Sequence, residues 1–206
     1  MHDDHPHPHE HRPDQDGPLS EYQLMEIAVR ELLIEKRILS ADEIRRTVEA
    51  MDARSPALGA RVVARAWADP AFKARLLADG TAACEELGIT MGGTNLVVVE
   101  STPDVHNLIV CTLCSCYPRM LLGLPPDWYK SRSYRARAVR EPRAVLREFG
   151  TELADGVTVR VHDSTADMRY LVLPLQPAGT EGWSEEQLAA LVTRDSMIGV
   201  SVPQTA

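Results

Sequence analysis

The sequence predicts an α+β fold in which a helical N-terminal arm precedes a layered body of helices and strands. A chain of 206 residues can bury a sizeable core but is too short to require two independent globular domains. Apolar residues recur every three to four positions as far as Leu87, and short β-branched runs begin near residue 95. We therefore expect a disordered tail over 1–18, a helical arm over 19–55 and one folded body over 56–206.

The N-terminal third contains the expected tail and four expected helices. Five of the seven histidines fall in the tail among Asp, Glu and Pro, with almost nothing apolar to bury: His2, His5, His7, His9 and His11. A helix with one apolar stripe is expected over 21–36, and Ser40, with Glu43 three residues later, marks the start of a second. Further helices are expected over 57–68 and, after Pro70, over 71–87.

After residue 95 the pattern changes to short runs of strand length. These runs are rich in β-branched residues and lie at 96–99, 108–110, 157–161 and 170–173. Helical patterns return at 127–139, 142–148 and 184–192. The body is therefore expected to be a layered α and β structure, without an internal repeat or a glycine-rich phosphate loop.

The overall charge and hydropathy exclude two classes of partner. A formal net charge of −8 argues against nucleic acid as a partner, because proteins that bind it concentrate positive charge. No apolar run approaches the roughly 18 residues of a membrane span, so no membrane partner is expected. The lack of an apolar signal region indicates the cytoplasm. The four cysteines should be reduced there, which favours a metal or reactive-thiol role over disulfides.

The most informative segment is V-C-T-L-C-S-C-Y-P at residues 110–118. It places Cys111, Cys114 and Cys116 in a tight loop after a strand-like run, and thiolates are strong, soft ligands for transition metals. Only one residue separates the last two cysteines, so the main chain must pass close to whatever their sulfurs bind. The amide nitrogens of Ser115 and Cys116 are therefore candidate metal ligands together with the three sulfurs.

Other uses of the three cysteines fit the sequence less well. A structural zinc site normally has four ligands in two pairs, and only His106 and Cys84 are nearby candidates for a fourth. An iron–sulfur cluster would require four cysteines in other spacings. A functionless cluster of free cysteines is improbable. Cys84 stands alone on an expected helix and is expected to lie in the core.

The segment C-T-L-C-S-C at 111–116 resembles the metal-binding loop, or claw, of nitrile hydratase alpha subunits. Other segments support the resemblance, which covers roughly residues 20 to 202: G-A-R-V-V-A-R-A-W-A-D-P at 59–70, L-G-L-P-P-D-W-Y-K at 122–130, Y-R-A-R-A-V-R-E-P-R at 134–143 and L-V-T-R-D-S-M-I-G-V at 191–200. The fold it implies has a helical arm and an α-β-β-α body, with 56–206 as the metal-binding catalytic domain.

The resemblance also implies a metal centre. It is a low-spin trivalent ion held by Cys111 as the axial thiolate, by the sulfurs of Cys114 and Cys116, and by the Ser115 and Cys116 amide nitrogens. Cys114 would be oxidised to sulfinic acid and Cys116 to sulfenic acid. Thr112 favours Co(III) over iron, because the family usually has threonine there with cobalt and serine with iron.

The activity implied is hydration of a nitrile to an amide, with Cys114, Ser115 and Cys116 at the reacting centre. The implied partners are a beta-type subunit, as one chain or two, and an activator that delivers cobalt. We expect the first helix to pack on the beta-type partner.

Departures from the pattern keep a second substrate open. Relatives usually continue with Trp-Pro where this chain has Arg119 and Met120, and thiocyanate hydrolase gamma subunits resemble it in that arginine, in a histidine-rich N-terminus and in the helix at 28–36. Leu124-Pro125-Pro126 resembles the nitrile hydratase form of that loop. The chain also resembles the alpha subunit of a three-subunit nitrile hydratase that acts on toyocamycin. We favour nitrile hydration. A non-catalytic cobalt carrier is a third alternative.

The segment H-D-S-T-A-D at 162–167 also departs from the family, which usually has W-D-S-S-S-E. The changes at His162 and Asp167 leave open what its carboxylates do. Arg169, beside an expected strand, is a candidate to brace the loop by a charge-assisted hydrogen bond.

Overall fold

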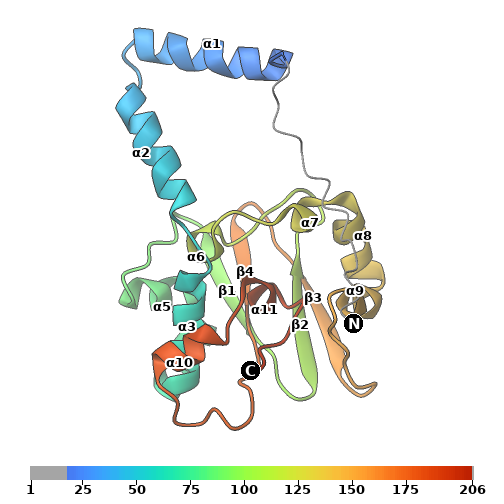
Figure 1. Ribbon diagram of the computed structural model, residues 1–206. Helices are drawn as coiled ribbons and strands as arrows, with labels where there is room; N and C mark the ends of the chain where they lie inside the picture. The colour runs from blue at the N-terminus through green and yellow to red at the C-terminus, as the bar shows by residue number, and fades with distance from the viewer. Residues whose placement is uncertain (1–17, 206) are drawn as a thin grey trace, which may run out of the picture. The chain divides into compact units, whose positions relative to one another are not determined.

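The computed structural model describes residues 18–205, which divide between Val48 and Glu49 into two compact units (Figure 1). The predicted histidine-rich tail lies outside the described residues apart from Pro18, and the arm and body boundaries at 55 and 56 stay a prediction. No described helix is both long enough and apolar enough to span a bilayer.

The first unit contains α1 (Glu21–Glu35) and most of α2 (Ala41–Asp52). Each helix begins with a reciprocal cap. Ser20 exchanges side-chain and main-chain hydrogen bonds with Gln23, and Ser40 does the same with Glu43, as its spacing predicts. Neither helix has a buried residue. Four apolar side chains of α1 are about half exposed: Leu24, Met25, Val29 and Leu32.

The second unit begins with α3 (Ala57–Ala68), α4 (Pro70–Ala78) and α5 (Gly80–Glu86). The prediction of one helix over 71–87 is wrong, because Asp79 has extended backbone and its side chain caps α5 at the amide of Ala82. The predicted helix over 127–139 is likewise two helices, α7 (Asp127–Lys130) and α8 (Arg132–Arg140). Ser131 lies between them with extended backbone and caps α8.

The four strands occupy the predicted positions and form two parallel pairs. One pair joins β1 (Asn95–Glu100) to β4 (Met168–Leu173), and the other joins β2 (Val105–Val110) to β3 (Thr158–Asp163). The remaining helices are α6 (Arg119–Leu122), α9 (Pro142–Glu148), α10 (Glu185–Ala190) and α11 (Arg194–Ile198).

The helices cover the two sheets from opposite sides (Figure 1). Helices α4 and α5 contact β1, whereas α8 contacts β2 and α9 contacts β3. Helix α11 contacts both β2 and β4. The body is therefore layered in the order α-β-β-α, as expected.

Strand β2 runs through the core and ends one residue before the first cysteine of the claw. Its last three residues, Leu108, Ile109 and Val110, are fully buried, and burying each such side chain stabilises the fold by about 1.5–3 kcal/mol. Gly199, which ends α11 with a φ of 92°, fixes the start of the strand. Its carbonyl accepts a 2.6 Å hydrogen bond from Nε2 of His106, and a Cβ at this position would overlap the Asn107 carbonyl oxygen.

Candidate metal centre

The three cysteines of the claw gather directly after β2. Cys111 continues the buried strand and is itself buried, whereas Cys116 is partly exposed and Cys114 exposed. The Sγ atom of Cys114 lies 3.5 Å from that of Cys111 and 3.3 Å from that of Cys116. All three sulfurs lie within 4.8 Å of one another. The sequence prediction that these side chains come together is confirmed.

The sulfur separations fit three neighbouring positions around one ion. For metal–sulfur bonds of about 2.3 Å, two sulfurs at a right angle lie about 3.3 Å apart, and two at the tetrahedral angle lie about 3.8 Å apart. The distances of 3.3 and 3.5 Å lie within this range. The three thiols are therefore close enough to bind one metal ion together.

Main-chain amides also face the sulfurs. The Cys114 amide donates a 3.3 Å hydrogen bond to Sγ of Cys111. The pKa of the Cys114 thiol is lowered, chiefly by hydrogen bonds from the Cys116 and Cys111 thiols and then by the Ser115 and Cys116 amides. Both amide nitrogens singled out from the sequence thus lie beside the cluster. Burial instead raises the pKa of Cys116.

Thr112, between the first two cysteines, is held by the side chain of Asp163. The Asp163 carboxylate accepts hydrogen bonds from the Thr112 amide at 2.9 Å and from its hydroxyl at 2.5 Å. Asp163 is the last residue of β3 and pairs in register with Val110, so the sheet itself brings the carboxylate beside the claw. The Thr112 hydroxyl is therefore engaged with a carboxylate of the next strand.

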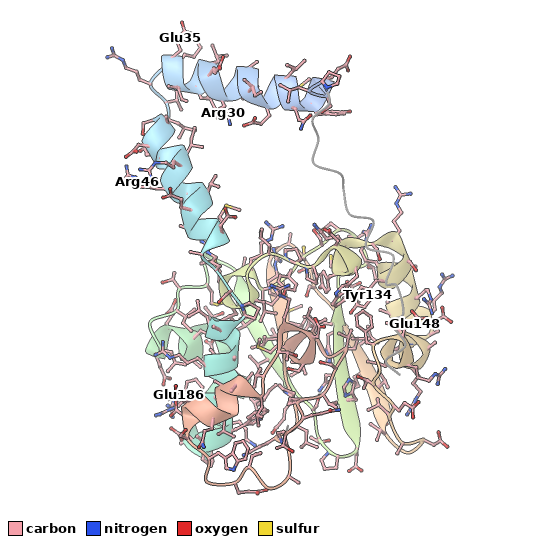
Figure 2. The ribbon with its side chains drawn as sticks, in the orientation of Figure 1. Arg30, Glu35, Arg46, Tyr134, Glu148 and Glu186 are labelled. Carbon is pink, nitrogen blue, oxygen red and sulfur yellow. The ribbon has the colours of Figure 1, made fainter. Side chains whose placement is uncertain are left out.

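Three further side chains hold the backbone of the claw, and the sequence analysis missed them. Tyr134 donates to the Ile109 carbonyl, Arg135 to that of Thr112 and Tyr129 to that of Cys116. Tyr134 belongs to α8, which packs against β2 (Figure 2). Because the acceptors are backbone carbonyls 13 to 25 residues away, spacing alone carries no sign of these bonds.

Arg169 braces the loop after β3, as its position suggested. Its Nη1 donates to the Thr165 carbonyl and, at 2.8 Å, to that of Ala166. Its positive charge also lowers the pKa of Cys116, against the larger effect of burial. The guanidinium is thus a cation from this chain near the claw.

The alternative of a zinc site with a fourth protein ligand gains no support. Cys84 lies in α5 with no exposed surface, as expected of a core residue, and His106 is engaged with Gly199. Among residues 18–205, the group of possible metal-binding side chains consists of the three claw cysteines. A tetrahedral site therefore lacks its fourth side chain there.

The model of the family described as nitrile hydratase, alpha chain, matches residues 20–201. The chain belongs to this family. It is 56% identical over 180 residues to the low-molecular weight cobalt-containing nitrile hydratase subunit alpha of Rhodococcus rhodochrous, covering 86% of this chain and 87% of that one. It is 46% identical to the thiocyanate hydrolase subunit gamma of Thiobacillus thioparus, covering 90% and 82%.

Solved structures agree with the expected fold. A recombinant thiocyanate hydrolase described as comprising partially modified cobalt centers superposes with a TM-score of 0.85 and 44% identity, over 91% of this chain and 92% of the other. The chain is thus an enzyme subunit of the nitrile hydratase alpha type, with the predicted α+β fold. An alpha-type subunit works together with partner subunits.

Proposed function

We propose that this chain is the catalytic subunit of a cobalt nitrile hydratase, which adds water across the C≡N bond of a small nitrile and yields the amide. The observation that carries the proposal is the cluster of three sulfurs with two main-chain amides at the end of β2. Cobalt-containing nitrile hydratase subunits more than half identical to this chain support it.

The proposed ligands are the sulfurs of Cys111, Cys114 and Cys116 and the amide nitrogens of Ser115 and Cys116. A bound trivalent cobalt ion supplies Lewis acidity, which polarises a nitrile or lowers the pKa of a water molecule. We propose Cys114 as a sulfinic acid and Cys116 as a sulfenic acid. The oxygen on Cys116 would act as the base that takes a proton from water, or as the nucleophile itself.

The second candidate substrate is thiocyanate, and Arg119 favours it. This arginine follows the claw at the start of α6, is exposed, and would attract an anion. The higher identity to nitrile hydratase subunits and the Leu124-Pro125-Pro126 loop support the nitrile. A cobalt carrier without turnover is the third and least favoured function.

The proposed assembly contains a beta-type subunit, as one chain or two, whose cationic side chains would pair with the oxidised sulfurs. A cobalt-delivering activator would load the claw. We place the protein in the cytoplasm, where reducing conditions disfavour disulfides between its cysteines.

The test compares kcat/KM of the cobalt-loaded assembly for a heteroaromatic nitrile and for thiocyanate. Preference for the nitrile supports the proposal, and preference for thiocyanate replaces it with the second candidate. The absence of both activities would favour the cobalt carrier.

Substitutions near the claw test the site itself. Arg119→Met should lower kcat/KM for thiocyanate more than for the nitrile. Cys114→Ala should abolish both cobalt content and turnover, while Cys84→Ala, which changes a cysteine outside the cluster, should preserve both.

A further inference from the structure

Helices α7 and α8 hold the backbone of the claw at three points. Tyr134 donates to the Ile109 carbonyl at 2.7 Å, Arg135 to the Thr112 carbonyl at 3.3 Å, and Tyr129 to the Cys116 carbonyl at 2.9 Å. The three acceptors lie before, inside and at the end of the cysteine loop. Two short helices thus determine the path of the segment that carries every proposed metal ligand.

The donors are themselves held in place by packing. Ser131 turns the chain between α7 and α8 and caps α8. The Trp128 ring meets the Tyr134 ring edge-on with centroids 4.9 Å apart, and the Tyr129 and Tyr134 centroids are 5.6 Å apart. Both tyrosine rings are almost fully buried. The helix pair is therefore a rigid support for the loop.

Arg135 has a feature that packing alone does not explain. Its Nε is buried and has no hydrogen-bond partner within the described part of the chain. Burying an unpaired donor is unfavourable, and an apolar side chain would fill the same space without that penalty. An arginine at this position is consistent with a role in its contact with the claw.

That contact completes a two-sided hold on Thr112. Asp163 from β3 binds the amide and hydroxyl of this residue, and Arg135 from α8 binds its carbonyl. The two peptide planes that flank Thr112 are therefore fixed from opposite elements. These planes set the turn that brings Cys114 back to within 3.5 Å of Cys111.

We propose that Arg135 is a positioning residue that presets the claw for the metal. By holding the Thr112 carbonyl it keeps the sulfurs gathered before the ion arrives, so the loop need not be ordered at the moment of binding. The inference rests on the proposed function, since it concerns the same metal centre. It predicts a defect in metal affinity and not in the chemical step.

The test replaces Arg135 in the assembled protein prepared without metal. Arg135→Met keeps the length of the side chain and removes its donors. Apparent affinity for Co(II), measured by competition with a chelator, should fall by about ten-fold, the low end for residues that orient metal ligands. Arg135→Lys should restore most of it, because the ammonium can donate to the same carbonyl. Arg132→Met, an exposed arginine on the same helix, should leave affinity unchanged.

Three further readouts make the result decisive. Turnover per bound cobalt and the sulfur-to-cobalt absorption of the loaded Arg135→Met variant should match the original protein. Unchanged cobalt affinity would overturn the inference, as would reduced turnover per cobalt. A lower melting temperature of the metal-free variant with unchanged affinity would show a merely structural role. If the unmodified assembly binds cobalt but hydrates neither substrate, the proposed function fails while the affinity comparison still tests Arg135.

Discussion

Replacing Gly199 by alanine should destabilise the fold at the strand that leads to the metal centre. Gly199 has a φ of 92°, in the left-handed region that favours glycine. An added Cβ would overlap the Asn107 carbonyl oxygen and lie 3.0 Å from the Asn107 carbonyl carbon and 3.1 Å from Cα of Leu108. All three atoms are backbone of β2, so relief requires α11 or the strand to move.

The expected loss of unfolding free energy has two parts, one from the left-handed backbone and one from the overlap of the added Cβ. The left-handed backbone costs an alanine about 1–2 kcal/mol, partly offset by about 0.4–1 kcal/mol from the less flexible unfolded chain. Overlap in a well-packed interior adds about 1–3 kcal/mol. Gly150 is the matched control, because its φ is 78° and a Cβ there would meet nothing within 4 Å.

The assay is thermal unfolding of the two purified variants in parallel. The extra overlap, about 2 kcal/mol, should place the melting temperature of Gly199→Ala about 4–8 °C below that of Gly150→Ala. Equal melting temperatures would refute the close approach of α11 to β2. Because β2 leads directly into Cys111, Gly199→Ala should also lower cobalt content, and Gly150→Ala should not.

Three more predictions concern the neighbours of the claw. Burial lowers the pKa of His106 and of His162 below the ordinary value of 6.5, so the unfolded chain takes up protons first and stability should fall as the pH drops below about 6.5. Denaturant midpoints at two pH values test this. If the midpoint of a His106→Asn variant fell by as much between the two pH values as that of the original protein, groups other than His106 would cause the effect. In a double-mutant cycle on the free energy of unfolding, Asp163→Ala and Thr112→Ala should show a coupling energy of about 1 kcal/mol. Additive effects would contradict the hydrogen bonds between these two residues. Tyr134→Phe should cost about 1 kcal/mol of unfolding free energy, because it removes a buried hydrogen bond to the Ile109 carbonyl; an unchanged midpoint would argue against this bond.

The sequence predicted the elements whose signal is local and periodic. All four strands were predicted, because β-branched runs of strand length mark them. The predicted helices over 71–87 and 127–139 failed at Asp79 and Ser131, since both residues cap a new helix inside an otherwise continuous apolar pattern. Helix α11 was missed because five residues are too few to establish a period.

The candidate site also has a part that the sequence predicts and a part that it does not. The cysteines could be read directly, because six consecutive positions of the chain contain all three. The groups that hold them could not, because Tyr129 acts from 13 residues away and Asp163 from 51. Bonds from side chains to distant backbone leave no periodic trace, and only the folded chain brings the partners together.

The nested pairing of the strands has a consequence for synthesis. The claw leaves the ribosome with β2, whereas Asp163, the partner of Thr112, follows 51 residues later on β3. At about 5–20 residues per second, the three cysteines are synthesised about 3–10 s before Asp163, whose carboxylate holds Thr112. The nascent chain therefore passes through a stage in which the cysteine loop is present but the carboxylate that holds Thr112 is not.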